Sequence, residues 1–271
     1  MAPRSSPAST DPPEAPVLRV RNLQVDVAPA EHDVALAWWA GALGGTPRST
    51  EEPEYTHLDG VRAATGVHVQ RLVDGPGRFH LDLETDGDVG AEVARLVDLG
   101  ATDVGALPGG EPGRVLADPA GLPLCLTATG QEQHLDESRD LARLFAVVFD
   151  VPAGLVEAEA AFWASVVDGH VVPPHPDHPE FRAVRGLQGP GGRLGVLVQE
   201  LGEGPAGMHV DLHVPDEAIR DAEVERLVGL GATVATRQDW VVLHVPGGHA
   251  TCVVPALEPP AAPPDAGPAA Q

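Results

Sequence analysis

Apolar and polar residues alternate strictly along residues 79–84, which read Phe-His-Leu-Asp-Leu-Glu. A period of two places the three apolar side chains on one face of a strand and His80, Asp82 and Glu84 on the other. We therefore predict a half-buried strand whose apolar face packs on a core and whose opposite face is polar.

The spacing becomes helical directly after this strand. Val89, Val93, Leu96 and Val97 recur at intervals of three and four residues, and Gly100 stands where a C-terminal helix cap belongs. This pattern predicts an amphipathic helix. Two short strands are expected to follow, around residues 114–117 and 122–127, on either side of a turn at 118–121.

The first part of the chain repeats this order of elements with a weaker apolar periodicity. It predicts a strand near residues 18–27, a helix from about 31 to 43 with Val34, Trp38 and Ala42 on one face, and short strands ending at 67–73. Residues 18–127 thus contain two β-α-β-β-β modules, and the fold class is α+β.

The whole arrangement occurs a second time. His80 and Asp82 align with His209 and Asp211, and the motif Leu-Gly-Ala-Thr at 99–102 recurs at 230–233. Three further alignments pair Gln70 with Gln199, Cys125 with Cys252, and Asp26 with Asp150, each aspartate preceding an aromatic pair by the same spacing. We infer two diverged copies of one domain, because a repeat of this length that occurs only twice is a duplication rather than a solenoid.

The domain boundaries follow from the ends of the repeat. We expect the first domain at residues 17–129, a polar linker at 130–140 and the second domain at 141–256. Residues 1–16 and the Pro/Ala-rich residues 257–271 have the composition of disordered tails.

Composition narrows the range of partners. The chain carries 40 acidic and 17 basic residues, a formal net charge of -23. Such a field repels phosphate backbones and anionic lipid, so nucleic acid and membrane surfaces are not expected as partners. The charge either keeps an acidic surface soluble or attracts a cationic ligand. Without a signal peptide pattern, a membrane-spanning apolar run or a set of paired cysteines, the chain is expected to be cytoplasmic.

Four features together resemble one family. They are the paired β-α-β-β-β modules, the strand motif His-Leu-Asp-Leu, the helix ending Leu-Gly-Ala-Thr and the Asp-Pro-x-Gly turn before the last strand. This combination resembles the vicinal-oxygen-chelate superfamily, in its glyoxalase-like and bleomycin-resistance-like branch. The resemblance implies that each copy forms a half-open, eight-stranded cup with a small molecule on its concave face. In metal-dependent members, His or Gln on strand one, Glu on strand four, His on strand five and Glu on strand eight hold a divalent cation.

Both family glutamates are replaced in both copies. The resemblance places the four positions at Gln24, Gln70, His80 and Cys125 in the first copy and at Val148, Gln199, His209 and Cys252 in the second. A carboxylate at these positions supplies an anionic ligand and a general base, and an amide does neither well. We therefore expect no catalytic metal and no other cofactor. A divalent metal in the first domain is the alternative, and Cys125 would favour a soft, zinc-like ion.

The residues that remain as ligand contacts are mostly those that the two copies share. They are Gln24, Gln70, His80, Asp82, Cys125, Gln199, His209, Asp211, Trp240 and Cys252. Each has a structural alternative: a buried His–Gln pair, cysteines that act as small buried hydrophobes, and a Trp240 that packs on an edge instead of stacking on a planar ligand. His170, His175 and His178 stand in a proline-rich segment that reads as a solvated loop rather than a metal site.

Two functional classes follow from these residues. The first is a protein that binds or sequesters a small metabolite or antibiotic, neutral or cationic, in one or both cups. The second is a lyase, isomerase or dioxygenase of the same superfamily with an altered metal shell. The missing carboxylates favour the first class. In a third arrangement, one cup is structural and the copies pack on each other or on a second chain.

Overall fold

The computed structural model describes residues 18–108, 112–128, 135–136, 141–186 and 194–255. The predicted tails at 1–16 and 257–271, and all of the predicted linker except residues 135–136, lie outside these residues.

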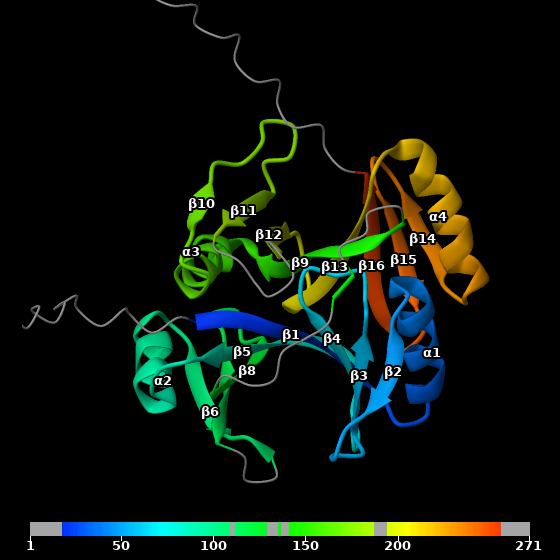
Figure 1. Ribbon diagram of the computed structural model, residues 1–271. Coiled ribbons are helices and arrows are strands. Elements are labelled where there is room, and N and C mark those ends of the chain that lie inside the picture. Colours follow the sequence, from blue (N-terminus) through cyan, green and yellow to red (C-terminus); the bar gives the residue numbers. More distant parts are fainter. Residues whose placement is uncertain (1–17, 109–111, 129–134, 137–140, 187–193, 256–271) are drawn as a thin grey trace, which may run out of the picture.

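Within the described residues, the first domain contains one sheet and two α-helices (Figure 1). Its first module comprises β1 (Leu18–Val27), α1 (His32–Leu43), β2 (Thr46–Ser49), β3 (Tyr55–Asp59) and β4 (Gly66–Arg71). Its second module comprises β5 (Arg78–Thr85), α2 (Val89–Asp98), β6 (Thr102–Ala106), β7 (Gly113–Ala117) and β8 (Pro123–Ala128). The eight strands lie in the order β2-β3-β4-β1-β5-β8-β7-β6.

The second domain repeats this arrangement. Its elements are β9 (Arg143–Pro152), the short 3-10 helix η2 (Ala153–Leu155), α3 (Val156–Val166), β10 (His170–Val172), β11 (Phe181–Arg185), β12 (Gly195–Leu201), β13 (Gly207–Val214), α4 (Glu217–Gly229), β14 (Thr233–Arg237), β15 (Val241–Val245) and β16 (His249–Pro255). The strand order is β10-β11-β12-β9-β13-β16-β15-β14, which matches the first sheet position by position. The prediction of an α+β fold with two tandem eight-stranded cups, each of two β-α-β-β-β modules, is confirmed.

The motifs that revealed the repeat also fix the ends of its helices. Asp88 and Asp216 cap α2 and α4, because each carboxylate accepts a hydrogen bond from the backbone N–H three residues later, at 2.8 and 2.9 Å. Gly100 and Gly231 follow the same helices with φ of 111° and 118°, a conformation that a side chain would strain. The next residue in each copy then donates its N–H back to the helix, which forms a Schellman cap.

Aromatic packing shows which face of each sheet the helices cover. Trp39 of α1 lies edge-to-face on Phe79 of β5, with ring centroids 5.8 Å apart, and Trp163 of α3 stacks on Phe149 of β9 at 4.4 Å. All of these rings are buried. The face of β5 that carries His80 and Asp82 therefore points away from the helices, and we call this side of each sheet the cup face.

One prediction about an individual residue was wrong, and one strand was not located. Val34 was placed on the buried face of its helix, yet it is 53% exposed, while Ala35, Trp38 and Trp39 are buried. The helix is apolar on most sides, and its burial is decided by the second domain, where Trp38 Nε1 donates to the Leu227 carbonyl at 3.3 Å. The strand β6 was not located, although the β-α-β-β-β module requires three strands after the helix, because this edge strand is almost entirely exposed and lacks an apolar alternation.

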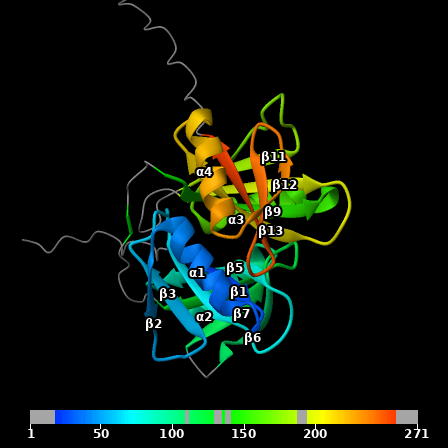
Figure 2. The same ribbon diagram turned by 90° about the vertical axis from the view of Figure 1, so that its right-hand side faces the viewer.

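The two domains pack through their helices. In both views α1 of the first domain lies beside α4 of the second (Figures 1 and 2). Arg226 of α4 donates to the carbonyls of Gly41 and Ala42 at the end of α1, at 3.0 and 2.9 Å. A second contact joins strands of the two domains, because His249 of β16 lies 3.2 Å from the Arg78 carbonyl of β5. These contacts join the two cups through hydrogen bonds as well as apolar packing.

Candidate functional site

Strand register determines which side chains share the cup face, because directly paired residues point to the same side of a sheet. In the first domain Gln24 of β1 pairs with His68 of β4 and with His80 of β5, and Asp82 of β5 pairs with Cys125 of β8. Asp26 pairs with Gln70 in the same way. The five candidate residues of the first copy (Gln24, Gln70, His80, Asp82 and Cys125) therefore all lie on the cup face.

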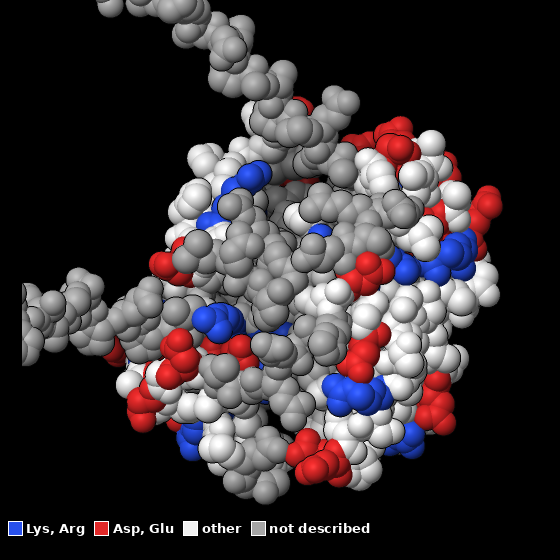
Figure 3. Space-filling model, viewed as in Figure 1, with Lys and Arg blue, Asp and Glu red and all other residues white. Residues whose placement is uncertain are grey.

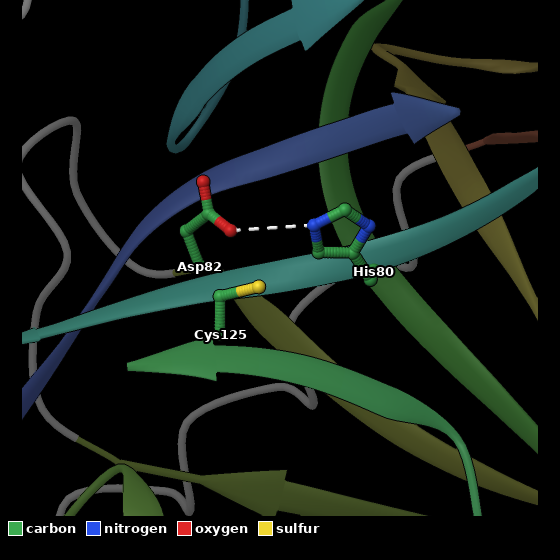
Figure 4. A group of neighbouring side chains, drawn as sticks. All are labelled: His80, Asp82 and Cys125. Atoms are coloured by element: carbon green, nitrogen blue, oxygen red, sulfur yellow. Dashed lines mark ion pairs between the residues drawn. The ribbon is translucent and has the colours of Figure 1, made fainter. Parts of the chain in front are cut away.

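At the centre of this face three ligand-type side chains converge (Figure 4). One donor atom from each of His80, Asp82 and Cys125 lies within 4.8 Å of the others. His80 Nε2 is 3.4 Å from Asp82 Oδ1, and the Cys125 sulfur points to the same space from β8. Adjacent strands thus assemble a nitrogen, an oxygen and a sulfur at one point.

The other ring nitrogen of His80 is held by a residue that sequence reasoning missed. Asp26 Oδ2 lies 3.1 Å from His80 Nδ1 and also accepts from Arg78 Nε at 3.1 Å. The signal for Asp26 was present, since Asp26 and Asp150 align between the copies, but their contact with the histidines depends on strand pairing across more than fifty residues. We call Asp26, His80, Asp82 and Cys125 the first histidine cluster.

The second domain builds the same group at the equivalent positions. His209 Nδ1 lies 2.6 Å from Asp150 Oδ2, and His209 Nε2 lies 3.8 Å from Asp211 Oδ1. His209, Asp211 and Cys252 again bring one donor atom each within 4.8 Å of the others. Asp150, His209, Asp211 and Cys252 form the second histidine cluster.

The aspartates govern the charge of both histidines. Burial lowers the pKa of His80, but its hydrogen bonds to Asp26 and Asp82 outweigh burial and hold the pKa well above its ordinary value. The same balance raises the pKa of His209 to about 10, with Asp150 as the main partner. Each cluster therefore contains an imidazolium between two carboxylates at neutral pH.

The cysteines do not have the environment of nucleophiles. Burial raises the pKa of the Cys125 thiol, and the histidine beside it does not offset this effect. Burial also raises the pKa of Cys252. Both cysteines are free, and they remain thiols at neutral pH.

The two glutamines lie farther from the histidines than the expected His–Gln pair requires. Strand β1 separates Gln70 of β4 from His80 of β5. Gln70 Nε2 instead donates to the Tyr55 hydroxyl at 3.1 Å. In the second domain Gln199 pairs with Phe181 in the register of β11 and β12. The partners of the histidines are aspartates, so the structural alternative of a buried His–Gln pair was wrong.

Gln24 is the predicted residue most closely tied to the first histidine cluster. Its amide nitrogen donates to Asp82 Oδ2 at 2.7 Å and lies 3.3 Å from His68 Nδ1. Two acceptors nearby, Gln24 Oε1 and Asp26 Oδ1, are buried and have no hydrogen-bond partner within the described part of the chain. Buried acceptors of this kind are uncommon and retain the capacity to accept from a bound molecule.

Trp240 lies beside aromatic residues of the opposite wall of the second cup. Its ring centroid is 6.1 Å from that of Phe181 and 5.8 Å from that of His178. His178 Nδ1 lies 3.5 Å from Glu180 Oε1, and His175 Nδ1 lies 3.7 Å from Asp177 Oδ2. Neither histidine belongs to a group of three metal-ligand side chains among the described residues, which agrees with the loop interpretation.

The donor set of each cluster can be compared with the metals that such donors bind. One imidazole, one carboxylate and one thiol fit a soft, zinc-like ion, and Asp26 and Asp150 hold the remote ring nitrogens as carboxylates do behind metal-bound histidines. The clusters do not match the two-histidine, one-carboxylate set of non-haem iron oxygenases, because each contains a single histidine. His80, Asp82 and Cys125, or their second-domain counterparts, are therefore the residues that could hold a metal.

Among the described residues on the face seen in Figure 3, acidic side chains do not gather in one group. Acidic and basic side chains are interspersed there around its edge. Within the described ranges no helix has both the length and the apolar character needed to cross a bilayer.

Comparison with known proteins agrees with this architecture. A family model described as a glyoxalase-like domain matches residues 23–127 and again residues 146–254. No curated protein sequence matches the chain.

Solved structures share the fold at low sequence identity. A Mn(II)-bound glyoxalase from Novosphingobium aromaticivorans is 20% identical, with a TM-score of 0.63, covering 89% of this chain and 84% of its own. Homoprotocatechuate 2,3-dioxygenase from Arthrobacter globiformis is 13% identical, with a TM-score of 0.59 and coverages of 89% and 80%. The 2,3-dioxygenase LapB from Pseudomonas sp. KL28 is 11% identical, with a TM-score of 0.59 and coverages of 88% and 92%.

Proposed function

Because the chain belongs to the glyoxalase-like domain family of the vicinal-oxygen-chelate superfamily, we propose that its cups bind a small organic molecule, neutral or cationic, and need no catalytic metal for this. The observation that supports the proposal is the duplicated pair of a histidine and the aspartate that holds it, His80 with Asp26 and His209 with Asp150, on the face that the helices leave uncovered.

Charge and hydrogen-bonding capacity define what such a cup would prefer. In the second histidine cluster two carboxylates and one imidazolium leave a net negative charge, which favours a cation over an anion. In the first cluster Arg78 also pairs with Asp26, so this cup suits a neutral ligand as well. The buried acceptors Gln24 Oε1 and Asp26 Oδ1 in the first cup favour a ligand that carries N–H or O–H groups. We therefore expect amines and polyols before carboxylates and phosphates.

The absence of family glutamates supports binding over isomerisation. The positions on strands four and eight hold Gln70, Gln199, Cys125 and Cys252. An amide is not a base, and a buried thiol whose pKa is raised cannot remove a carbon-bound proton at neutral pH. Asp26 and Asp150 are already engaged by the histidines that they hold.

A library screen by thermal shift tests the proposal. Hits should raise the melting temperature of the wild type, and His80→Ala or His209→Ala should reduce that gain, depending on which cup is occupied. Removing a hydrogen bond worth on the order of 1 kcal/mol weakens affinity about fivefold. Glu225→Ala, at an exposed position on α4 and so away from the cup face, is the control and should respond as the wild type does. Hits that stabilise every variant equally would refute the site.

A metal-dependent enzyme is the second candidate, and the convergence of His80, Asp82 and Cys125 specifically favours it. A bound zinc-like ion would supply Lewis acidity toward a carbonyl or a water. Elemental analysis of purified protein decides between the candidates. Near-stoichiometric zinc, manganese or iron that falls in Cys125→Ser and Cys252→Ser would support this second candidate, and metal far below one ion per chain in the wild type would support the first.

A further inference from the structure

The cup faces of the two domains differ systematically around their shared histidine clusters. Directly paired residues on neighbouring strands form rows that run across each sheet. One row passes through the histidine of the cluster and another through its aspartate, so each row of the first sheet can be compared with the equivalent row of the second. In the row through the histidine, the first cup has His57, His68 and Gln24, and the second cup has Ala183, Leu197 and Val148. Apolar side chains thus replace polar ones beside an unchanged polar cluster.

The row through the aspartate differs in the same direction. Tyr55 pairs with Gln70 in the first cup, and Phe181 pairs with Gln199 in the second. Tyr55 accepts a hydrogen bond from Gln70 through its hydroxyl, which Phe181 lacks. The ring of Phe181 is therefore free of this bond and lies on the same face as Asp150, because Gln199 also pairs with Asp150.

Trp240 completes an aromatic wall on this side. It immediately precedes β15, whereas Phe181 lies on β11, and these strands are separated by four others in the sheet order. Their rings nevertheless lie 6.1 Å apart, because the curvature of the sheet brings its two ends toward each other. Of the four tryptophans, Trp240 is the one that is not buried, and Phe181 is also only partly buried.

We infer that the second cup is specialised for a planar aromatic ligand bearing a cationic group, with the ring against Phe181 and Trp240 and the charge toward Asp150 and Asp211. Aromatic side chains provide stacking area, and the replaced row of Ala183, Leu197 and Val148 offers apolar contact in place of hydrogen bonds. Two carboxylates beside one imidazole keep the polar end negative. This inference rests on the proposed function and assigns a ligand class to one of its two cups.

Calorimetry with three matched probes tests the inference. The probes are 2-naphthylmethylamine, its saturated decahydro analogue and 2-naphthoate, which separate planarity from size and positive charge from negative. We expect the aromatic amine to bind at least about fivefold more tightly than either of the others, since stacking and charge each contribute on the order of this factor. Equal affinity of the aromatic and saturated amines, or no binding of the aromatic amine, would overturn the inference.

Point variants in each cup show which of the two cups binds the aromatic amine. Trp240→Ala and Phe181→Leu should each weaken the aromatic amine about fivefold, while Trp240→Phe should keep its affinity within about twofold because the ring is retained. Tyr55→Leu alters the matching position of the first cup and should change nothing. Loss of binding in Tyr55→Leu, or unchanged binding in both Trp240→Ala and Phe181→Leu, would contradict the assignment.

Failure of the inference can be told apart from failure of the proposed function. If the naphthyl amine does not bind, but library compounds bind to the wild type and lose affinity in His80→Ala, the aromatic specialisation is wrong and the binding function stands. If no compound responds to changes in either histidine cluster, the proposed function is wrong as well.

Discussion

Amide donors distinguish the acid chemistry of the two histidine clusters. Gln24 at 2.7 Å and Asn22 at 3.4 Å donate to Asp82, whereas Val148 and Ala146 stand at the matching positions beside Asp211. Burial raises the pKa of Asp82, but hydrogen bonds from His80 and Gln24 outweigh burial, so the pKa is lowered. Asp211 has Val148 where Asp82 has Gln24, and burial raises its pKa to about 6, although His209 acts in the opposite direction. The second cluster therefore gains a proton at a pH where the first does not.

We predict that Val148→Gln lowers the pKa of Asp211 and that Gln24→Val raises that of Asp82. The new or lost amide donor changes the stabilisation of the carboxylate, and one pKa unit corresponds to about 1.4 kcal/mol. Carbon-detected NMR titration of the side-chain carboxyls measures both values. The expected consequence is that cation binding to the second cup weakens as pH falls through about 6, because the protonated Asp211 is neutral. An unchanged Asp211 titration in Val148→Gln would show that the amide is not the cause.

Sequence reasoning reached some of these residues and missed others for a physical reason. Alternation along residues 79–84 placed His80 and Asp82 on one face, and the structure shows them there. Alternation is a local property of one strand. The contact between Asp26 and His80 arises from the antiparallel pairing of β1 with β5, and no pattern within either strand specifies that pairing.

At the scale of elements, the C-terminal end of α1 has free carbonyl groups that accept hydrogen bonds from a residue of the other domain. The last turn of α1 contains no basic residue to interact with its free carbonyls. Arg226 of α4 supplies the positive charge by donating to the Gly41 and Ala42 carbonyls. Arg62 also donates to Ala42, at 2.9 Å. Charges at this end of a helix favour its dipole.

We predict that Arg226→Gln destabilises the protein by about 2 kcal/mol more than Arg95→Gln does, since hydrogen bonds to charged groups contribute about 1.5 to 3 kcal/mol each. Arg95 is a matched control because it pairs with Glu92 on α2 as Arg226 pairs with Glu223 on α4. Within the described residues Arg95 makes no hydrogen bond to the second domain. Unfolding free energies from urea titration provide the comparison, and equal losses would mean that the interdomain bonds contribute nothing.

The helices with clear capping signals were predictable, whereas their packing partners were not. Asp88, Asp216 and the two Leu-Gly-Ala-Thr motifs mark helix ends through local hydrogen bonds. The buried side of α1 depends on the second domain, which covers Trp38 and leaves Val34 exposed. An exposed edge strand such as β6 leaves no apolar pattern from which to predict it.

At the scale of the whole molecule, a buried pair of carboxyl groups joins the two domains. Glu159 of α3 is fully buried and accepts hydrogen bonds from the Ala120 N–H at 3.0 Å and from Trp163 Nε1 at 2.6 Å. Asp118, in the same turn as Ala120, is also buried. Burial and the neighbouring Asp118 raise the pKa of Glu159 to about 9 from an ordinary value of 4.5, so the carboxyl is protonated when the domains are packed.

The pH dependence of stability follows from this shift. The folded protein holds a proton that the unfolded chain releases, so the contribution of Glu159 is fully present below about pH 4.5 and is lost as pH rises to about 9. We predict that Glu159→Gln, which cannot ionise, flattens the decline in melting temperature between pH 6 and pH 9. Glu157→Gln, at an exposed position on the same helix, should follow the wild type. Identical pH profiles for wild type and Glu159→Gln would contradict a protonated carboxyl at this interface.

The repeat in the sequence was enough to predict two cups but not how they meet. Separate sheets follow from complete copies of all eight strand positions in each half. Contacts such as Trp38 with Leu227 or Glu159 with Ala120 join residues that the repeat does not align. These contacts arise from side chains that differ between the copies. Aligning the two copies therefore cannot reveal them.

The most direct test of the central claim is a crystal structure of the protein with the strongest hit from the library screen. The proposed function predicts that the ligand lies on a cup face, with a polar group within hydrogen-bonding distance of His80, Asp26 or Gln24 in the first domain, or of His209, Asp150 or Asp211 in the second. A ligand bound on the helix side of a sheet or between α1 and α4, with both histidine clusters unchanged, would contradict it.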